Sequence, residues 1–405
     1  MILGAVGRIL VLMSTKSRRR ILAALLALAT TSIVASSPEA DSGDAKVAYA
    51  LSVGSKTRLV GWLESYDVRS GERRALTSKP RVGSRVADRL PIWSPDGASV
   101  AFVRRNSRSH ATGVYVLGAD GTTGHIATVS AKNYQAVWPL RWAPAGDRLV
   151  FDRWGNVECR VQKPFNLRFM VSGASRGGSF EIAATPRPRK LVQLGDIRWS
   201  PDGTQLLYIV YELDNSGYNP NECRFHRPES LLYSVGAHGT DRRLLAQGEV
   251  QSVAWAPDGD RIAYVDCENA VEACDLLVAK SDGTTRRVIS SGDVVPAADI
   301  AWTPDGQEVL VSDTDGLHAV DTVTKTQRTI ASFDVEEFGD WPAEIQRFSS
   351  DGDIVALLLG YGLSSGFRQI SATTLLVDLR SGRTSRIVVR APKGASIGDA
   401  DVYLP

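Results

Sequence analysis

Short apolar runs, separated by turns rich in Gly and Pro, recur along the chain and predict β-strands. Val100–Val103, Leu206–Ile209 and Ile262–Val265 are runs of four apolar residues that each follow a Gly-containing turn. A further apolar run comes next, as in Val114–Leu117, and then a second tight turn such as Asp120-Gly121. Runs of this length, rich in β-branched and aromatic residues, are typical of strands. The pattern therefore predicts an all-β chain.

The turns themselves repeat at intervals of roughly 50 residues, a period typical of repeat folds. Six segments begin with an aromatic residue and end in Gly, mostly with Pro-Asp between: Trp93–Gly97, Trp142–Gly146, Trp199–Gly203, Trp255–Gly259, Trp302–Gly306 and Phe348–Gly352. Pro presets φ at a turn corner, Asp bonds its own backbone and Gly supplies a positive φ. Each turn should join the first two strands of a four-stranded antiparallel unit. Such units, repeated around a ring, make a β-propeller.

The two ends of the chain together suggest one more unit. Lys46–Ala50, Leu59–Tyr66 and Arg73–Leu76 match the second, third and fourth strands of a unit that has no first strand. Asp401–Leu404 resembles a first strand. We therefore expect seven blades, with six as the alternative, and closure of the ring by the C-terminal strand.

The Trp-Ser-Pro-Asp-Gly repeats resemble those of the TolB-like family of WD-like β-propellers, which also occur in the propeller domains of some oligopeptidases and in certain lyases. The resemblance covers about residues 45–405. It implies the propeller fold strongly and a function weakly. TolB-like propellers have six blades, and TolB carries an N-terminal α/β domain for which this chain has no length left.

The N-terminal segment has the composition of an export signal. Lys16 and Arg18–Arg20 precede the apolar or small residues Ile21–Ala35. Fifteen residues span only about 22 Å as a helix, which is short for a bilayer. We expect a signal peptide at 1–35, a linker at 36–45 and a single propeller at 46–405, with an uncleaved anchor as the alternative.

Two further details concern the start of the chain and its route. Ser17–Leu22 resembles a twin-arginine signal, although a Sec signal fits equally. Met13 is an alternative start. Either route predicts a secreted or extracytoplasmic protein without a permanent membrane span.

Net charge argues against nucleic acid as a partner. The formal charge is +2, and residues 1–35 carry five basic residues and no acid, so the remainder has +2 − 5 = −3. A nucleic-acid binder would show a basic excess.

We also expect the protein to be a monomer.

Four cysteines in an exported chain favour disulfides. Cys267 ends a predicted second strand and Cys274 begins a third, so a bond across the neck of that hairpin is expected. The same register leaves Cys159 to pair with Cys223.

Two long segments should lie on one face of the propeller, because each joins a second strand to a third in adjacent blades. They hold aromatic and Arg residues, the types enriched in binding hot spots. We expect partner binding there, through Trp154, Arg160, Phe165, Tyr218, Arg224, Phe225 and His226. The alternative is that these loops only pack on each other.

No segment has the context that catalysis would need. Gly-x-Ser-x-Gly occurs at Gly173–Gly177 and Gly362–Gly366 without a following helix. Cys223-x-x-His226 is half of a zinc motif, and Asp313-x-Asp315-Gly316 suits a turn better than a calcium loop. We expect no catalytic residue, no metal and no cofactor.

The central channel is the remaining candidate site. Asp196 and Asp299 stand three residues before Trp199 and Trp302, and Arg141, Arg198 and Arg347 directly precede their repeat aromatics. Acids at the channel mouth can bind a cation or polar ligand, or they can cap strand ends.

Three functions are compatible with these observations. The favoured one is a non-enzymatic binding scaffold for a protein or for a carbohydrate or other cell-envelope ligand. The second is an extracytoplasmic carbohydrate lyase or hydrolase with its site at the channel mouth. The third is a detached regulatory propeller resembling those of oligopeptidases.

Overall fold

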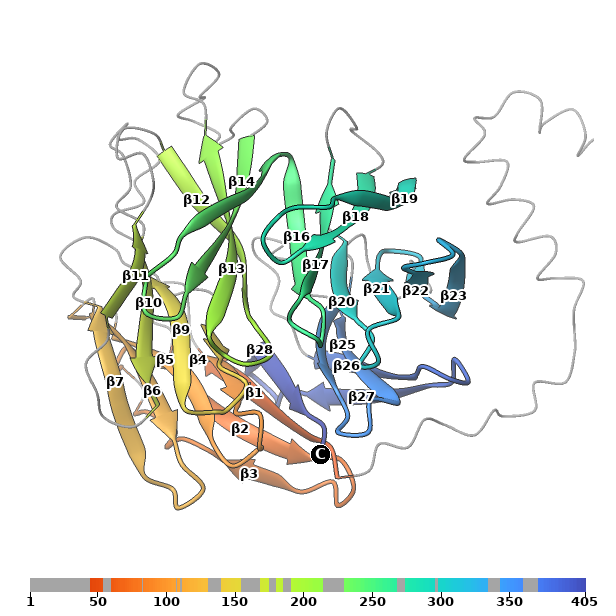
Figure 1. Cartoon of the computed structure of the whole chain (residues 1–405). Helices are drawn as coiled ribbons and strands as arrows, with labels where there is room; N and C mark the ends of the chain where they lie inside the picture. The colour runs from red at the N-terminus through yellow and green to blue at the C-terminus, as the bar shows by residue number, and fades with distance from the viewer. Residues whose placement is uncertain are drawn as a thin grey trace, which may run out of the picture. The chain divides into compact units, whose positions relative to one another are not determined.

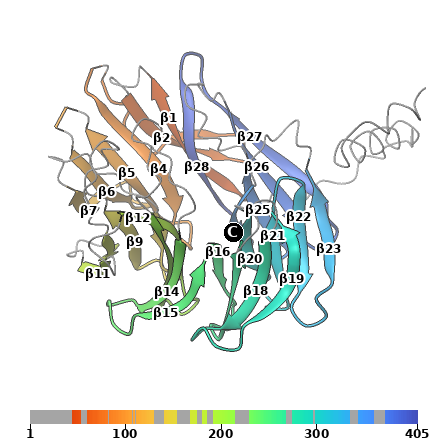
Figure 2. The ribbon, with the colours of Figure 1, turned by 90° about the horizontal axis from the view of Figure 1, so that it is seen from above.

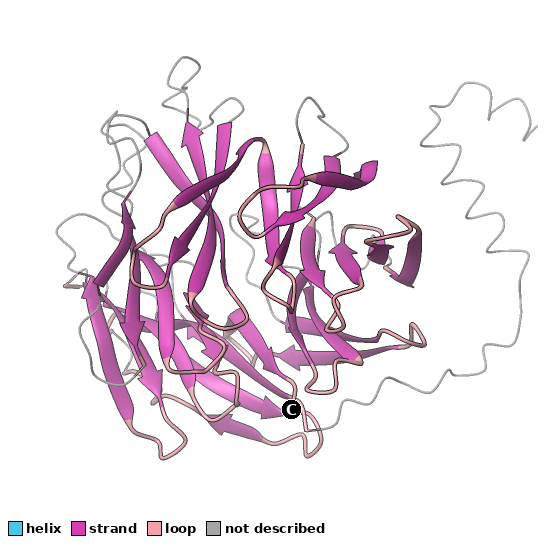
Figure 3. Cartoon of the chain, in the orientation of Figure 1, coloured by secondary structure: helices cyan, strands magenta, loops and turns pink. Residues whose placement is uncertain are grey.

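A computed structural model describes residues 44–53, 60–81, 83–106, 108–109, 111–129, 140–153, 168–174, 180–184, 191–213, 229–267, 274–295, 298–333, 343–359 and 371–405. Contacts divide the chain into Met1–Glu39 and Ala40–Pro405, and all described residues lie in the second unit. They form strands joined by turns and loops, with no helix among them (Figure 3). Accordingly, no helix of the described ranges could cross a membrane. The expected all-β class is confirmed.

The first half of the described chain holds fifteen strands (Figure 1). These are β1 (Lys46–Val53), β2 (Val60–Asp67), β3 (Arg73–Ala75), β4 (Val86–Trp93), β5 (Val100–Asn106), β6 (Ala111–Leu117), β7 (Thr123–Val129), β8 (Leu140–Trp142), β9 (Arg148–Arg153), β10 (Arg168–Gly173), β11 (Phe180–Ala184), β12 (Leu191–Trp199), β13 (Gln205–Leu213), β14 (Glu229–Gly236) and β15 (Arg243–Gly248).

The second half holds thirteen more. These are β16 (Val250–Trp255), β17 (Arg261–Asp266), β18 (Cys274–Lys280), β19 (Arg287–Val294), β20 (Asp299–Trp302), β21 (Glu308–Ser312), β22 (Gly316–Asp321), β23 (Gln327–Ser332), β24 (Glu344–Phe348), β25 (Ile354–Leu359), β26 (Ser371–Asp378), β27 (Thr384–Arg390) and β28 (Ser396–Tyr403).

The strands form a β-propeller of four-stranded antiparallel blades. Five separate sheets hold β8–β11, β12–β15, β16–β19, β20–β23 and β24–β27. One larger sheet runs β28-β1-β2-β4-β5-β6-β7, with β3 on β2. Among the described strands, backbone pairing between its two halves is limited to a parallel bridge from Gly61 to Ala87. The C-terminal strand β28 pairs antiparallel with β1.

The first strands of the units succeed one another around the channel. Contacts join β4 to β8, β8 to β12, β12 to β16, β16 to β20, β20 to β24, β24 to β28 and β28 to β4. Seen from above, the sheets follow one another around a central axis (Figure 2).

The repeat turn is built by its own side chains. Ser200 Oγ donates to Asp202 Oδ1 at 2.6 Å and accepts from the Gln205 amide at 2.9 Å. Hydroxyl and amide donors hold the pKa of Asp202 below its usual value. Gly203 has φ of 69°, where an L side chain would be strained. Local hydrogen bonds thus explain why this sequence forms this turn.

Alternating side chains along the middle strands pack against the two neighbouring blades. Leu206 and Tyr208 of β13 join a core with Val150 of β9. Leu207 and Ile209, on the other face, join a core with Trp255 of β16. Burial on both faces is the reason the strands are apolar runs.

One disulfide occurs among the described residues, between Cys267 and Cys274, with Cα atoms 4.2 Å apart. It joins the residue that follows β17 to the first residue of β18, as the strand register of the repeats predicts. Such a bond is consistent with an oxidising, extracytoplasmic compartment.

Candidate functional site

The channel holds a cluster of carboxylates and guanidinium groups from several blades. Arg198, on β12, donates from Nε to Asp196 Oδ2 at 2.8 Å and from Nη2 to Asp299 Oδ1 at 3.0 Å. Asp299 begins β20, and β16 lies between β12 and β20 in the ring. The Arg198 side chain therefore brings the two expected acids into one ion triad across a blade.

Both acids also accept hydrogen bonds from backbone amides. Asp196 Oδ1 accepts from the amide of Ile197 at 2.9 Å. Asp299 accepts from the amides of Ile300 at 3.0 Å and Ile345 at 2.8 Å. Asp299 thus lies at the start of β20, as one of the sequence alternatives requires, whereas Asp196 lies inside β12, at a register shift between Leu194 and Ile197.

The triad is largely removed from solvent, with 24% of the Arg198 side chain and 16% of each Asp side chain exposed. Burial raises the pKa of Asp299 to about 6, against the lowering effect of Arg198. The two carboxylates raise the pKa of Arg198 further above its usual value, although its burial acts the other way. With two acids and one guanidinium, the triad carries one net negative charge when both acids are ionised.

A second ion pair crosses the channel. Arg141 Nη2 of β8 lies 3.3 Å from Glu344 Oε1 of β24, although these two strands are not neighbours in the ring. Arg347, also on β24, donates to the carbonyls of Trp93 at 3.0 Å and Ser94 at 3.2 Å. The arginines that precede the repeat aromatics therefore tie distant blades together.

Sequence reasoning missed two acids of this cluster, Glu344 and Asp401. Asp401 Oδ2 accepts from the Trp93 amide at 2.7 Å, and burial raises its pKa to about 6. Asp401 could have been identified by its position, because it lies in the C-terminal segment that resembles the first strand of a unit. Glu344 is the first residue of β24, as Asp299 is of β20.

An aromatic hollow of about 250 Å³ lies beside Arg198, toward the short-turn ends of the inner strands. The rings that line it come from successive repeat turns and are Trp199, Trp255, Trp302 and Phe348. The channel therefore combines an aromatic wall with charged groups.

The other expected binding residues fall outside the described part of the chain: Trp154, Arg160, Phe165, Tyr218, Arg224, Phe225 and His226, and with them Cys159 and Cys223. The strand pairs on either side of these residues do belong to the described part. Arg153 pairs with Arg168 at the end of the β9–β10 hairpin, and Glu212 pairs with Glu229 at the end of β13–β14.

The minor motifs have structural partners where they are described. Asp313 Oδ1 accepts from the amides of Asp315 and Gly316, so this segment is the expected turn. His318 lies 3.4 Å from Asp313 and 3.1 Å from the Thr329 hydroxyl. Within the described residues, no group of three His, Cys, Asp or Glu side chains could hold a metal. Ser175 and Ser364, the central residues of the Gly-x-Ser-x-Gly motifs, lie outside those residues.

Comparisons with known proteins show the fold. No family model matches the chain, and no curated protein matches its sequence. Oligogalacturonate lyase in complex with manganese is 15% identical with a TM-score of 0.54, covering 83% of this chain and 87% of the lyase. The β-propeller domain of the Trilobed protease from Pyrococcus furiosus, described as having an open velcro topology, is 14% identical with a TM-score of 0.54. That match covers 88% of this chain and 98% of the domain.

TolB from Acinetobacter baumannii also matches, at 13% identity and a TM-score of 0.44, over 89% of this chain and 67% of TolB. The sequence identities of all these matches are too low to imply a shared function, so the similarities concern the fold alone. By its fold, the chain is a β-propeller of antiparallel blades, as its TolB-like repeats predict.

Proposed function

We propose that the protein is an exported, non-enzymatic propeller that binds a protein or a cell-envelope carbohydrate through its long loops. One observation carries this proposal. The β9–β10 and β13–β14 hairpins belong to sheets that pack on each other, through Val150, Val171, Ile197 and Tyr208. Both hairpins open at the end opposite the short repeat turns. The described strand ends before and after segments 154–167 and 214–228 therefore lie on the same face of neighbouring blades.

The test compares the two faces. Alanine at Trp154, Arg160, Phe165, Tyr218, Arg224, Phe225 or His226 should weaken binding of an isolated ligand by about 1–3 kcal/mol wherever the residue is a hot spot. The matched control is Thr122→Ala, because Thr122 lies in the short β6–β7 turn on the opposite face, where its hydroxyl donates to Asp120. Calorimetry measures both. Loss of affinity in the control, with full affinity in the loop variants, would show that the wrong face was chosen.

The blade count belongs to the same proposal. The eight-stranded sheet divides at its single parallel bridge into β28-β1-β2-β3 and β4–β7. Together with the five separate sheets, this division makes seven blades. The cyclic contacts of the inner strands, from β4 round to β28, support that count.

Export and the second disulfide complete the proposal. We infer that residues 1–35 direct the chain out of the cytoplasm and that Cys159 pairs with Cys223. Peptide mapping without reduction should recover that linked pair from exported protein. A free Cys159, or its linkage to Cys267, would contradict the inference.

An alternative function is a carbohydrate lyase or hydrolase. Asp299, whose pKa is raised to about 6 beside Arg198, has the proton affinity of a general acid or base near neutral pH. The test is turnover of oligogalacturonate and other acidic saccharides by the purified protein, compared with Asp299→Asn. Activity equal in both proteins, or absent from both, would remove this candidate.

A further inference from the structure

Two of the interfaces between neighbouring blades are closed at their short-turn ends by an arginine that stands six residues after a repeat Trp. Arg148, at the start of β9, lies over the Trp199 ring of the next blade at 5.2 Å and donates to the Gly203 carbonyl at 2.9 Å. Arg261, at the start of β17, does the same to Trp302 at 4.7 Å and Gly306 at 3.0 Å. In both cases one long cation fills the space between two turns.

The blade between these two has no arginine at the same position. Six residues after its repeat Trp, where Arg148 and Arg261 stand in theirs, it has the shorter Gln205. The other three repeats also lack an arginine there and have Ser99, Glu308 and Ile354. No such arginine therefore lies between β12–β15 and β16–β19.

The glycine of the next turn also has open space beside it. A Cβ on Gly203 would lie 3.2 Å from Arg148 and 3.6 Å from Pro144, and one on Gly306 would meet Arg261 at 3.1 Å. The other repeat turns also touch a neighbour: Gly146 meets Pro95, Gly352 meets Pro304 and Gly97 meets Tyr403. Gly259 alone among these six described glycines would have nothing within 4 Å of an added Cβ.

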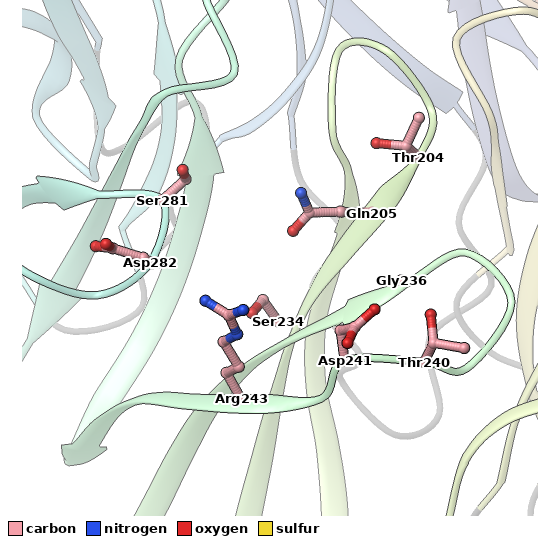
Figure 4. A pocket seen from close by; sticks show the side chains of 9 residues that line it. All are labelled: Thr204, Gln205, Ser234, Gly236, Thr240, Asp241, Arg243, Ser281 and Asp282. Atoms are coloured by element: carbon pink, nitrogen blue, oxygen red, sulfur yellow. The ribbon is translucent and has the colours of Figure 1, made fainter.

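A hollow of about 340 Å³ lies at this interface (Figure 4). Ser234 pairs with both Leu207 and Arg243, and Gln205 pairs with Gly236, so these side chains share the face of the sheet that looks toward the next blade. Ser281 and Asp282, from the β18–β19 turn, form the opposite wall. Arg286 of that turn bonds to the Leu245 carbonyl, which holds this wall against β15.

The lining is polar throughout and contains donors and acceptors of both charges. Ser234 is 4% exposed and lies deep, while Gln205, Asp241 and Arg243 are exposed around it. Among the described residues, the Arg243 guanidinium has no hydrogen-bond or ion-pair partner. Hydrogen bonds from Thr284 are the main cause that lowers the pKa of Asp282, and the charges of Lys280 and Arg243 also lower it. An anion would face two carboxylates and a cation would face Arg243. A hydroxyl group both donates and accepts hydrogen bonds. A ligand with several hydroxyls therefore matches both the carboxylates and the guanidinium that line the hollow.

We propose that this hollow is a binding site for one hydroxyl-rich saccharide unit, with Gln205, Ser234 and Arg243 bonding its hydroxyls. Its volume lies in the range of small-ligand pockets, at the lower end, which suits a single sugar ring. The site lies on the face opposite the long loops, so it is independent of the function proposed above.

The experiment uses the mature chain and saturation-transfer NMR. The probes are glucose, galactose, N-acetylglucosamine and glucuronate, each at about 10 mM, with inorganic phosphate followed by 31P line broadening, since affinities for a shallow polar site are expected near the millimolar range. At least one of the saccharides should bind. Gln205→Arg should abolish that binding by filling the hollow as Arg148 and Arg261 fill theirs, and it should raise the urea midpoint. Arg243→Met should weaken binding roughly ten-fold or more through loss of charge-assisted bonds.

The matched control is Arg74→Met, which removes another exposed arginine from an outer strand, β3, far along the ring. It should bind the probes as the unaltered protein does. If Gln205→Arg does not fold, the comparison of saccharide binding by Arg243→Met and Arg74→Met is the deciding test. The proposal is overturned if no saccharide binds, if phosphate binds in their place, or if Arg243→Met keeps full affinity.

Discussion

Removal of the C-terminal strand should cost most of the stability of the propeller. β28 pairs with β1 along its length and places Ile397, Val402 and Leu404 in the core, each at most 6% exposed. Burial of each such side chain contributes about 1.5–3 kcal/mol, so their loss amounts to about 5–9 kcal/mol. A typical domain has only about 5–15 kcal/mol in total. Deletion of residues 396–405 should therefore abolish cooperative unfolding and leave β1 as an open, aggregation-prone edge.

A milder variant keeps the prediction measurable if the truncated protein aggregates. Val402, fully buried opposite Val47, loses two methyl groups in Val402→Ala. At about 0.8 kcal/mol each, plus a term for the cavity, the free energy of unfolding should fall by about 2 kcal/mol. The control is Val388→Ala on the outer strand β27, where the side chain is 44% exposed and little change is expected.

Urea unfolding followed by tryptophan fluorescence provides the assay. Trp93 is a local reporter, because its ring centroid lies 6.2 Å from that of Tyr403 in β28. A truncated protein that unfolds at the same urea concentration as the full chain, or equal effects of Val402→Ala and Val388→Ala, would refute ring closure by β28.

Three further outcomes follow from single features of the structure. Because burial raises the pKa of Asp299 from 3.8 to about 6, the folded state binds that proton more tightly than the unfolded state, so the free energy of unfolding should fall as pH rises from about 4 to about 6. Asp299→Asn should flatten this fall in urea titrations at several pH values, and a steeper fall would contradict the assignment. Ser200→Ala removes the hydroxyl that bonds both Asp202 and the Gln205 amide, and it should lower stability by about 1–2 kcal/mol; an unchanged urea midpoint would mean that the turn does not depend on these bonds. Loss of the Cys267–Cys274 bond frees a short loop and should lower the free energy of unfolding by about 2–3 kcal/mol in the chain-entropy model; the measurement is the urea midpoint of Cys267→Ala/Cys274→Ala, which leaves Cys159 and Cys223 unchanged, and an unchanged midpoint would contradict this stabilisation.

Local chemistry explains how much of the fold was predictable. The turns were found because Ser, Pro, Asp and Gly act within five residues of one another, as the bonds of Ser200 and Asp202 show. The Cys267–Cys274 bond was predictable for the same reason, since the hairpin register brings its two ends together. β28 was predicted from its likeness to other first strands, and its pairing with β1 agrees.

The sites depended on residues far apart in the chain. Asp196 and Asp299 were recognised individually, but their bridge through Arg198 requires β12 and β20 to face each other across β16. The Arg141–Glu344 pair likewise depends on the closed order of the ring.

The hollow beside Gln205 shows the difference most directly. The sequence by itself determined the strands, the turns and the repeated unit, because backbone hydrogen bonding and turn chemistry act between near neighbours. The hollow is lined by residues of two blades, from Gln205 on β13 to Asp282 in the β18–β19 turn. These residues come together only when the blades pack on each other, so the hollow follows from the tertiary structure.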